Sequence, residues 1–338
     1  MTDLTRLRAT YLFDRSLSDL DALRPLLRRA ATAGITTLVT KAAAVTGPLV
    51  RLCHDHGLRV LGSVPCLSDH ADPLDRPDLR PVDQHGGWAR MEWYTGLIPT
   101  DAGYADDLTR RCARLAAEPG LDGLLLDFLR WPLHWELELR PGAVPRESSF
   151  DPTTLAAFTR ATGERLPAAR PAAVALLLGP LRTEWYAFRT RVISDLAARL
   201  AAAIRTVRPD ATVGMFLVPG DAGQRALVGQ DVAALGEHVD GFLVMTYHGI
   251  VARPPSWIAA TVADLAARTS RPVVPMLQTT ADRRVARGAD WGGPLDAAGF
   301  AAALARAPGP LCLFPAEGMD DPRWRLLATT PAADPRSL

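Results

Sequence analysis

The sequence predicts a single (β/α)8 barrel, the TIM-barrel fold, spanning residues 1–338. Three observations support this prediction. Apolar runs alternate with segments of helical periodicity along the chain, which is typical of α/β proteins with a parallel sheet. Residues 123–126 are apolar, read as a strand buried on both faces, and are followed at once by Asp127. Long polar insertions follow the third and fourth expected strands, on the side where barrel active sites form.

Eight short apolar runs are expected to form the barrel strands. Their ranges are 9–13, 36–40, 59–64, 122–128, 212–218, 241–247, 272–277 and 311–314. In the fourth run, residues 123, 125 and 127 share one face by period-2 alternation, and we expect that face to point into the barrel. An open doubly wound sheet is the rival architecture, but no G-x-G-x-x-G motif follows the first strand.

Helices are expected between these strands. Their ranges are 18–34, 47–56, 101–117, 184–207, 256–268 and 296–306, and shorter helices open at residues 151 and 231. The first helix has leucines at helical spacing, with Ser18 as its expected N-cap. Gly57 is the expected C-cap of the second helix. Asp151 and Pro152 fit the N-cap and the first turn of another helix.

Composition excludes several classes of partner. The formal net charge is +1, which gives no charge bias toward nucleic acid or a membrane surface. The N-terminal residues have no apolar signal core, and no segment approaches the roughly 18 uninterrupted apolar residues of a membrane span. We therefore expect a cytoplasmic protein, with a short disordered tail at about 330–338. The oligomeric state cannot be read from the sequence.

No cofactor or metal is expected. The sequence has no P-loop, no dinucleotide fingerprint and no H-E-x-x-H motif. Its four cysteines form no C-x-x-C pair and are expected to be buried free thiols. They are Cys53, Cys66, Cys112 and Cys312.

Asp127 is the first candidate for chemistry, because a carboxylate at the C-terminal tip of a barrel strand lies where catalytic groups are found. An N-cap or a structural partner for Arg130 is the alternative. Carboxyl groups that act as acid and base generally work in pairs, one donating a proton and the other accepting one. We favour Glu317, just past the eighth strand, although a solvated loop glutamate is equally consistent. The remaining candidates are Asp14, Asp221, Glu136 and Glu138.

Further polar and aromatic residues follow the expected strands and are candidates for binding a substrate. They are Asp14, Lys41, Trp93, Arg130, Trp131, Asp221, Tyr247, His248 and Gln278. Tryptophan offers a flat apolar face for a ring of a ligand. Arg130 either clamps a substrate oxygen or forms a structural ion pair with Asp127. Tyr247 fits a core role as well as ligand binding, and Gln278 fits a capping role as well as ligand binding. Lys41, the single lysine, is also a candidate Schiff-base former.

One motif resembles a known family. Asp122-Gly123, three leucines and Asp127-Phe128-Leu129-Arg130-Trp131-Pro132 resemble the fourth-strand motif of glycoside-hydrolase-like barrels. Further similarities occur at residues 151–163, at Trp185 with Phe188-Arg189, and in "VRPDATVGMF" and "VDGFLVMTYH". Together they cover roughly residues 120–280. The chain is similar to the uncharacterised family 10-like glycosyl hydrolase groups and, more distantly, to chitinase-like family 18 barrels.

The family 18 pattern is incomplete. Its D-G-x-D-x-D-x-E motif places the second aspartate at Leu125 and the catalytic glutamate at Leu129, so the chemistry of that family is not expected. The resemblance implies a glycoside hydrolase acting on an oligosaccharide or glycoconjugate, with a carbohydrate as the partner. Two alternatives stay open, a non-catalytic carbohydrate-binding barrel and a Lys41-dependent lyase or aldolase.

Overall fold

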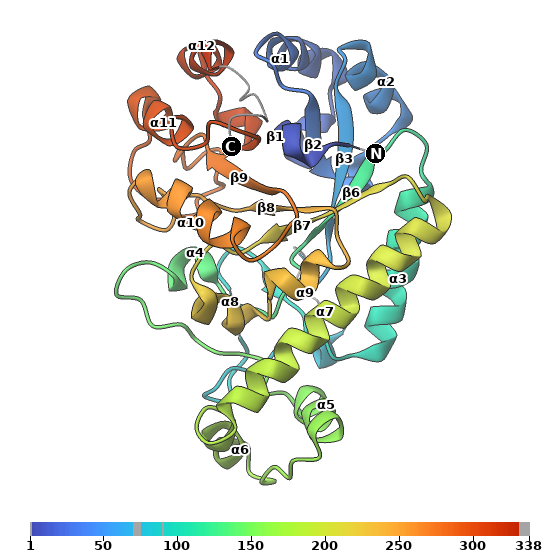
Figure 1. Cartoon of the computed structure of the whole chain (residues 1–338), viewed down its shortest axis with the longest axis vertical. Coiled ribbons are helices and arrows are strands. Elements are labelled where there is room, and N and C mark those ends of the chain that lie inside the picture. The colour runs from blue at the N-terminus through green and yellow to red at the C-terminus, as the bar shows by residue number, and fades with distance from the viewer. Residues whose placement is uncertain (1, 70–75, 90, 331–338) are drawn as a thin grey trace.

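The fold is a closed barrel of parallel strands, in the order β1-β10-β9-β8-β7-β6-β3-β2 (Figure 1). The computed structural model describes residues 2–69, 76–89 and 91–330. Closure occurs because β1 pairs with both β2 and β10. The predicted (β/α)8 barrel is therefore confirmed, and the open doubly wound sheet is excluded.

The barrel strands agree with the sequence prediction except at their ends. They are β1 Arg8–Tyr11, β2 Thr37–Lys41, β3 Arg59–Pro65, β6 Gly123–Asp127, β7 Thr212–Leu217, β8 Gly241–Val244, β9 Val273–Gln278 and β10 Leu311–Phe314. β8 ends three residues earlier than predicted. There the backbone forms three successive tight turns, since the amides of Thr246, Tyr247 and His248 each bond the carbonyl two residues earlier.

Period-2 alternation separates two cores, as predicted. Leu125 packs inside the barrel with Val39, Leu61 and Leu243. Leu124 and Leu126 point the other way and join the larger core between the barrel and its helices. Because Asp127 has the parity of Leu125, its side chain continues the inward face at the end of the strand.

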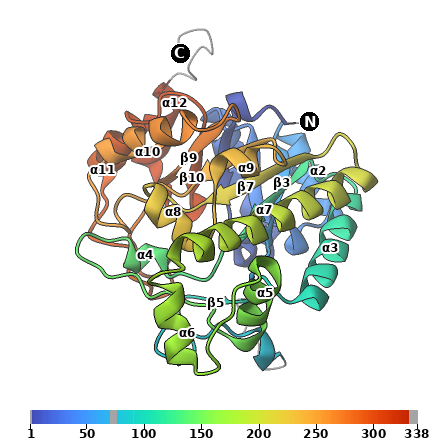
Figure 2. The same cartoon turned by 60° about the horizontal axis from the view of Figure 1, so that its bottom comes forward.

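Helices surround the barrel (Figures 1 and 2). The longer ones are α1 Leu20–Thr32, α2 Gly47–Asp55, α3 Ala102–Ala117, α7 Arg182–Val207, α10 Ser256–Ala266, α11 Ala297–Leu304 and α12 Asp321–Thr329. Asp151 caps α5 (Pro152–Thr162) as predicted. The prediction of Ser18 as an N-cap is wrong. Asp19 caps α1 instead, because its carboxylate accepts the amides of Asp21 and Ala22.

Four shorter helices complete the set, namely α4 Trp135–Glu138, α6 Arg170–Leu177, α8 Ala222–Val228 and α9 Val232–Gly236. Of these, only α9 was predicted. The others are short and lie in proline- or glycine-rich stretches that read as loops.

Two long segments follow β3 and β6, and they brace each other. We call residues 66–101 the first insertion and residues 128–151 the second insertion. The first contains a two-stranded ribbon, β4 Ser68–Asp69 with β5 Thr95–Gly96. Asp83 of the first forms an isolated bridge with Ser148 of the second. The amide of Phe150 also bonds the carbonyl of Val82. Figure 2 shows α4, α5, α6 and β5 gathered at the same end of the molecule.

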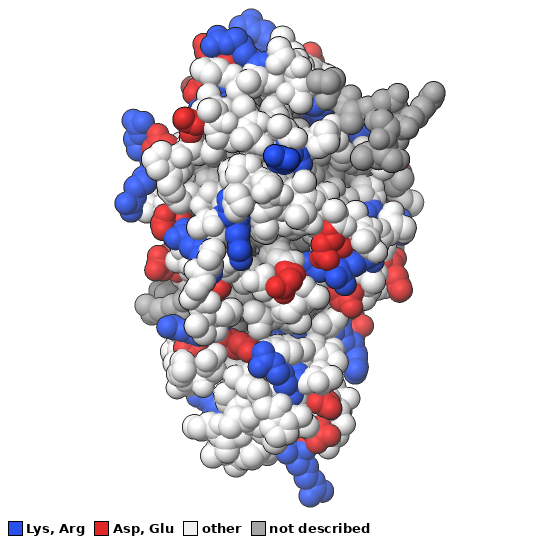
Figure 3. Space-filling model, turned by 60° about the vertical axis from the view of Figure 1, so that its left-hand side comes forward, with Lys and Arg blue, Asp and Glu red and all other residues white. Residues whose placement is uncertain are grey.

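The remaining global predictions concern cysteines, membranes and charge. All four cysteines are free and buried, as expected. Within the described residues, no helix has the length and apolar character that crossing a bilayer requires. On the face shown in Figure 3, acidic and basic side chains are interspersed. The predicted disordered tail, apart from residue 330, lies outside the described residues.

Candidate active site

A cavity of about 720 Å³ opens at the C-terminal ends of the barrel strands. Its volume lies within the range of about 300–1,000 Å³ that is usual for small-molecule sites. We call charged side the lining residues from the two insertions and β6, namely Glu92, Trp93, Tyr94, Asp127, Phe128, Arg130 and Glu136. We call aromatic side the rings and apolar side chains among the other lining residues, which include Tyr11, Phe13, Phe216, Met245, Tyr247, Ile250, Trp291 and Phe314.

The cavity collects some of the predicted site residues and not others. Those on its wall are Asp14, Lys41, Trp93, Asp127, Arg130 and Tyr247. Those that the structure places elsewhere are Trp131, Asp221, His248, Gln278 and Glu317. No sequence pattern favoured Glu136 over Glu317, and none pointed to Tyr94.

Asp127 is the last residue of β6, and its carboxylate faces the cavity. One oxygen accepts the amide of Phe128 at 2.8 Å, and the other accepts the Ser63 hydroxyl at 3.2 Å. Burial raises the pKa of Asp127 to about 6, and Arg130 opposes that rise. The next residue, Phe128, has a φ of 50°, a left-handed conformation that is rare for a bulky side chain. The strand therefore ends in a sharp, strained turn directly beside this carboxylate.

Glu136 provides a second carboxyl group on the same wall. It lies on α4, whose fully buried Trp135 anchors the helix over the barrel. Burial raises the pKa of Glu136 to about 7, and the nearby Asp127 adds to the rise while Arg130 opposes it. Glu138, on the same helix, lies outside the cavity and accepts the amide of Arg146. Glu92 and Glu136 both line the cavity with Asp127, and Glu317 does not. Of the two, Glu136 is the buried glutamate whose pKa Asp127 helps to raise.

Arg130 holds the charged side together. Its guanidinium is buried and donates to the Tyr94 hydroxyl at 3.1 Å. Its central carbon lies 4.9 Å from the centre of the Phe128 ring and 5.3 Å from that of Tyr94. The charge of this buried cation lowers the pKa of both Asp127 and Glu136, so it favours the ionised form of each carboxyl group.

Lys41 and Asp14 form an ion pair at the cavity edge. Lys41 Nζ lies 3.6 Å from Asp14 Oδ2, and the two side chains are 38% and 47% exposed. A Schiff-base lysine is generally activated in a desolvated pocket or beside another cation. The surroundings of Lys41 are of the opposite kind and suit hydrogen bonding to a polar ligand.

The aromatic side of the cavity is a packed cluster of rings. Phe314 lies at its centre, stacked on Tyr247 with ring centres 4.6 Å apart. Its ring also contacts Trp291 at 5.5 Å and Tyr11 at 5.3 Å. The ring centre of Phe13, in the loop after β1, lies 5.6 Å from that of Phe314. Such a cluster presents fixed apolar ring faces to whatever occupies the cavity.

Glu317 does not lie on the cavity wall, contrary to our expectation. It lies in a short 3-10 helix, Ala316–Gly318, directly after β10. One carboxylate oxygen accepts the Phe13 amide at 3.1 Å and the Ser16 hydroxyl at 2.5 Å. The carboxyl group therefore fastens the loop after β1 to the loop after β10.

Trp131 and His248 are also displaced from the cavity. Trp131 is fully buried against Trp185 and Phe188, and its indole N–H donates to the Arg189 carbonyl at 2.9 Å. The left-handed turn after Asp127 directs this part of the chain back under α7. His248 is buried beside the strand end, and burial lowers its pKa. Neither side chain is available to a ligand in the cavity.

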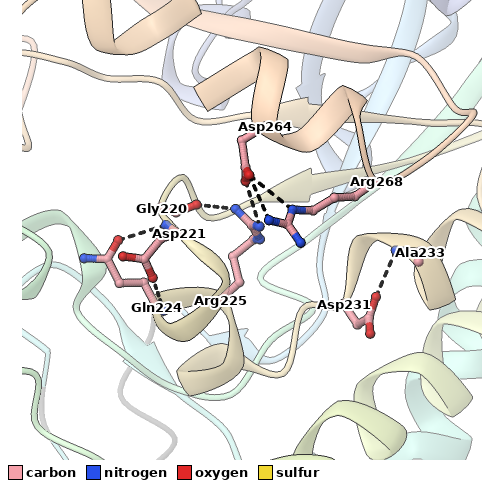
Figure 4. Close-up of polar contacts among 8 residues, drawn as sticks. All are labelled: Gly220, Asp221, Gln224, Arg225, Asp231, Ala233, Asp264 and Arg268. Atoms are coloured by element: carbon pink, nitrogen blue, oxygen red, sulfur yellow. Dashed lines mark hydrogen bonds and ion pairs between the residues drawn. The ribbon is translucent and has the colours of Figure 1, made fainter. Parts of the chain in front are cut away.

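Asp221 caps α8, as Figure 4 shows. Its side chain accepts the amide of Gln224, and the Gln224 side chain accepts the amide of Asp221 in return. In the same view Arg225 lies between the carbonyl of Gly220 and the carboxylate of Asp264, which also binds Arg268. This network joins α8 to α10 and leaves Asp221 a structural role.

Gln278 ends β9 as predicted, but it is fully buried and bonded only to backbone in the described structure. Its amide oxygen accepts the Ile250 amide at 3.0 Å. Its amide nitrogen donates to the carbonyls of Thr280 and Trp291, both at 2.9 Å. Gln278 therefore holds together the loops that carry Ile250 and Trp291 to the cavity.

The Gln278→Met variant should lose about 2–4 kcal/mol of unfolding free energy, because three backbone groups lose their partner at a buried site. Methionine is chosen because it keeps the approximate volume. Urea unfolding followed by circular dichroism measures the change. A loss below about 1 kcal/mol, the net value of one ordinary hydrogen bond, would show that the loops hold without Gln278.

Comparison with known proteins supports the fold. No family model matches the sequence, and no curated protein matches it either. Among solved structures, the glycoside hydrolase domain of PgaB (BpsB) from Bordetella bronchiseptica is similar with a TM-score of 0.72 and 16% identity, over 97% of this chain and 99% of that one. The two chains share the closed (β/α)8 barrel fold.

Two further structures show the same architecture. The catalytic domain of a beta-amylase from Paenibacillus polymyxa has a TM-score of 0.61 at 10% identity, over 95% of both chains. A beta-galactosidase from Marinomonas ef1 has a TM-score of 0.67 at 9% identity. The match covers 95% of this chain but only 58% of the galactosidase. The expected resemblance to glycoside-hydrolase-like barrels is confirmed at the level of the fold.

Proposed function

We propose that the protein is a glycosidase in which Asp127 and Glu136 are the two catalytic carboxyl groups. The observation that carries the proposal is their shared position on the wall of one cavity, at the end of the barrel where active sites form. Glycoside hydrolysis needs one carboxyl group that donates a proton and another that acts as nucleophile or base.

The two environments suggest which group has which role. The pKa of Asp127 is raised to about 6 and that of Glu136 to about 7. Between these values Asp127 is mainly ionised and Glu136 mainly protonated. In the proposed reaction Glu136 protonates the glycosidic oxygen, while Asp127 attacks the anomeric carbon or removes a proton from the attacking water. Arg130 limits how far both pKa values rise and keeps Asp127 available as an anion.

The rest of the cavity suits a carbohydrate. Its volume of about 720 Å³ fits a short oligosaccharide or a glycoconjugate of similar size. The ring cluster around Phe314 offers apolar faces to sugar rings, while Lys41, Asp14 and Glu92 offer partners for hydroxyl groups. The structural neighbours are themselves named as a glycoside hydrolase domain, a beta-amylase and a beta-galactosidase, which adds support.

The proposal is tested by incubating the protein with a panel of 4-nitrophenyl glycosides that differ in sugar and anomeric configuration. We expect release of nitrophenol from at least one member. The Asp127→Asn variant should then lose at least about 10²–10⁴-fold in kcat/KM, because one of two essential carboxyl groups is gone. Circular dichroism should show an unchanged fold.

Asp221→Asn is the matched control. It makes the same chemical change at an N-cap outside the cavity, where asparagine caps equally well, so activity should be retained. Near-normal turnover by the Asp127→Asn variant would contradict the assignment. Saturable sugar binding by a protein that cleaves no glycoside would favour the non-catalytic carbohydrate-binding barrel instead.

A further inference from the structure

The Tyr94 hydroxyl connects Arg130 and Glu136 inside the cavity wall. It lies 2.9 Å from Glu136 Oε2, 2.9 Å from the Leu133 carbonyl oxygen and 3.1 Å from Arg130 Nη2. The side chain is only 7% exposed, and its ring packs edge-on against Phe128 with ring centres 4.9 Å apart. The hydroxyl therefore has a fixed position, and only its proton is free to rotate.

These contacts admit two arrangements, because a phenol has one proton and two acceptor sites. Arg130 always donates to the oxygen. When Glu136 is ionised, the phenol proton points to its carboxylate. When Glu136 is protonated, the carboxyl proton points to the phenol oxygen, and the phenol proton turns to the Leu133 carbonyl, which can only accept. The first arrangement satisfies Arg130 and Glu136, and the second satisfies Arg130, Glu136 and the Leu133 carbonyl.

We propose that Tyr94 is a positioning residue that fits both protonation states of Glu136 by rotating its hydroxyl between that carboxylate and the Leu133 carbonyl. The catalytic meaning of this inference rests on the proposed function, since an acid catalyst gives up and regains a proton in each turnover. Tyr94 itself stays a neutral phenol, because burial holds its pKa well above the usual range.

Several charged or titratable groups face Glu136 and set the direction of the expected effect. Asp127 raises its pKa, while Arg130 and the Tyr94 hydroxyl lower it, and Tyr247 lies nearby as a neutral phenol. A hydrogen bond to the ionised carboxylate is about twice as strong as one to the neutral acid. Removing the hydroxyl therefore costs the ionised form more, and the pKa of Glu136 should rise.

The experiment is a ¹³C NMR titration of protein labelled at the glutamate carboxyl carbons and at tyrosine Cζ. The Glu136 resonance is identified by its loss in the Glu136→Gln variant, and the Tyr94 resonance by its loss in the Tyr94→Phe variant. In the Tyr94→Phe variant we expect the midpoint to move to higher pH by about one pH unit, the difference between a charge-assisted and a neutral hydrogen bond. In the wild-type protein, the ring ¹³Cζ resonance of Tyr94 should titrate with the same midpoint as Glu136.

Tyr186→Phe is the matched control. Tyr186 lies on α7, outside the cavity, and its hydroxyl donates to a carboxylate oxygen of Glu147 at 2.7 Å. This control should leave the Glu136 midpoint unchanged. An unchanged or lower midpoint in the Tyr94→Phe variant overturns the inference. If that variant does not fold, the wild-type protein still tests the inference. A Tyr94 ¹³Cζ chemical shift that stays constant over the pH range in which Glu136 titrates overturns the inference as well.

The readout does not depend on turnover. Coupled titration of Tyr94 and Glu136 without any detectable glycoside hydrolysis would sustain the pairing and reject the proposed function. Hydrolysis that requires Glu136, together with an unchanged Glu136 midpoint in the Tyr94→Phe variant, would reject the pairing and sustain the proposed function. With a substrate identified, the alkaline limb of the kcat/KM profile should also move to higher pH in that variant, because Glu136 remains protonated longer.

Discussion

The Glu136→Gln variant is expected to hydrolyse alkyl glycosides and oligosaccharides roughly 10²–10⁴-fold more slowly than the wild-type protein, because it removes the proposed proton donor. The loss should be far smaller for glycosides with an acidic leaving group, such as 2,4-dinitrophenol, which departs without protonation. Plotting log(kcat/KM) against the leaving-group pKa for both proteins measures this. The variant should give the steeper dependence.

Glu138→Gln provides the control on the same helix. Glu138 is two residues away, also partly buried, but outside the cavity. This variant should keep the wild-type dependence on the leaving group. Equal losses across all leaving groups in the Glu136→Gln variant would assign Glu136 to substrate binding and leave the acid unidentified.

The second large effect concerns stability and pH. The pKa of Glu136 is about 7 in the folded protein against an ordinary value of 4.5. The folded state therefore binds this proton more tightly than the unfolded state, so the free energy of unfolding falls as the pH rises from about 4.5 to about 7. At 1.36 kcal/mol per pH unit of difference, Glu136 alone accounts for a decline of about 3 kcal/mol.

The Glu136→Gln variant should lack this decline. Relative to wild type, its free energy of unfolding should gain about 3 kcal/mol between pH 4 and pH 8. Urea unfolding at both pH values measures the difference. Glu164→Gln, at an exposed position, serves as the control and should parallel the wild-type curve. A constant difference between wild type and the Glu136→Gln variant would mean that burial does not penalise the charge at this position.

The barrel and Asp127 were predictable because local patterns determine them. The alternation of apolar runs and amphipathic segments specifies strands and helices, and closure follows from their number and order. Asp127 could be placed because strand parity fixes which side chains point inward. The same parity argument has no force after Phe128, where a left-handed turn changes the direction of the chain, so Trp131 was placed wrongly.

The proposed partner of Asp127 could not be predicted from the sequence for a related reason. Tyr94 lies in the first insertion and Glu136 in the second, 42 residues further along the chain. Neither insertion has a periodic pattern of apolar residues. Their meeting depends on contacts between loops. Glu317, in contrast, follows directly on a strand and looked better placed by sequence. Its 3-10 turn directs the carboxylate to the Phe13 amide and the Ser16 hydroxyl instead.

The mutual bracing of the two insertions has a consequence for how such a barrel acquires new specificity. The bridge between Asp83 and Ser148, the bond between Phe150 and Val82, and the contact between Tyr94 and Glu136 all cross from one insertion to the other. A loop graft that replaces one insertion alone therefore removes one of the two residues that form each contact. Recombination between distant barrels of this kind should succeed only when both segments are inherited together, as one exchangeable module on an unchanged strand framework.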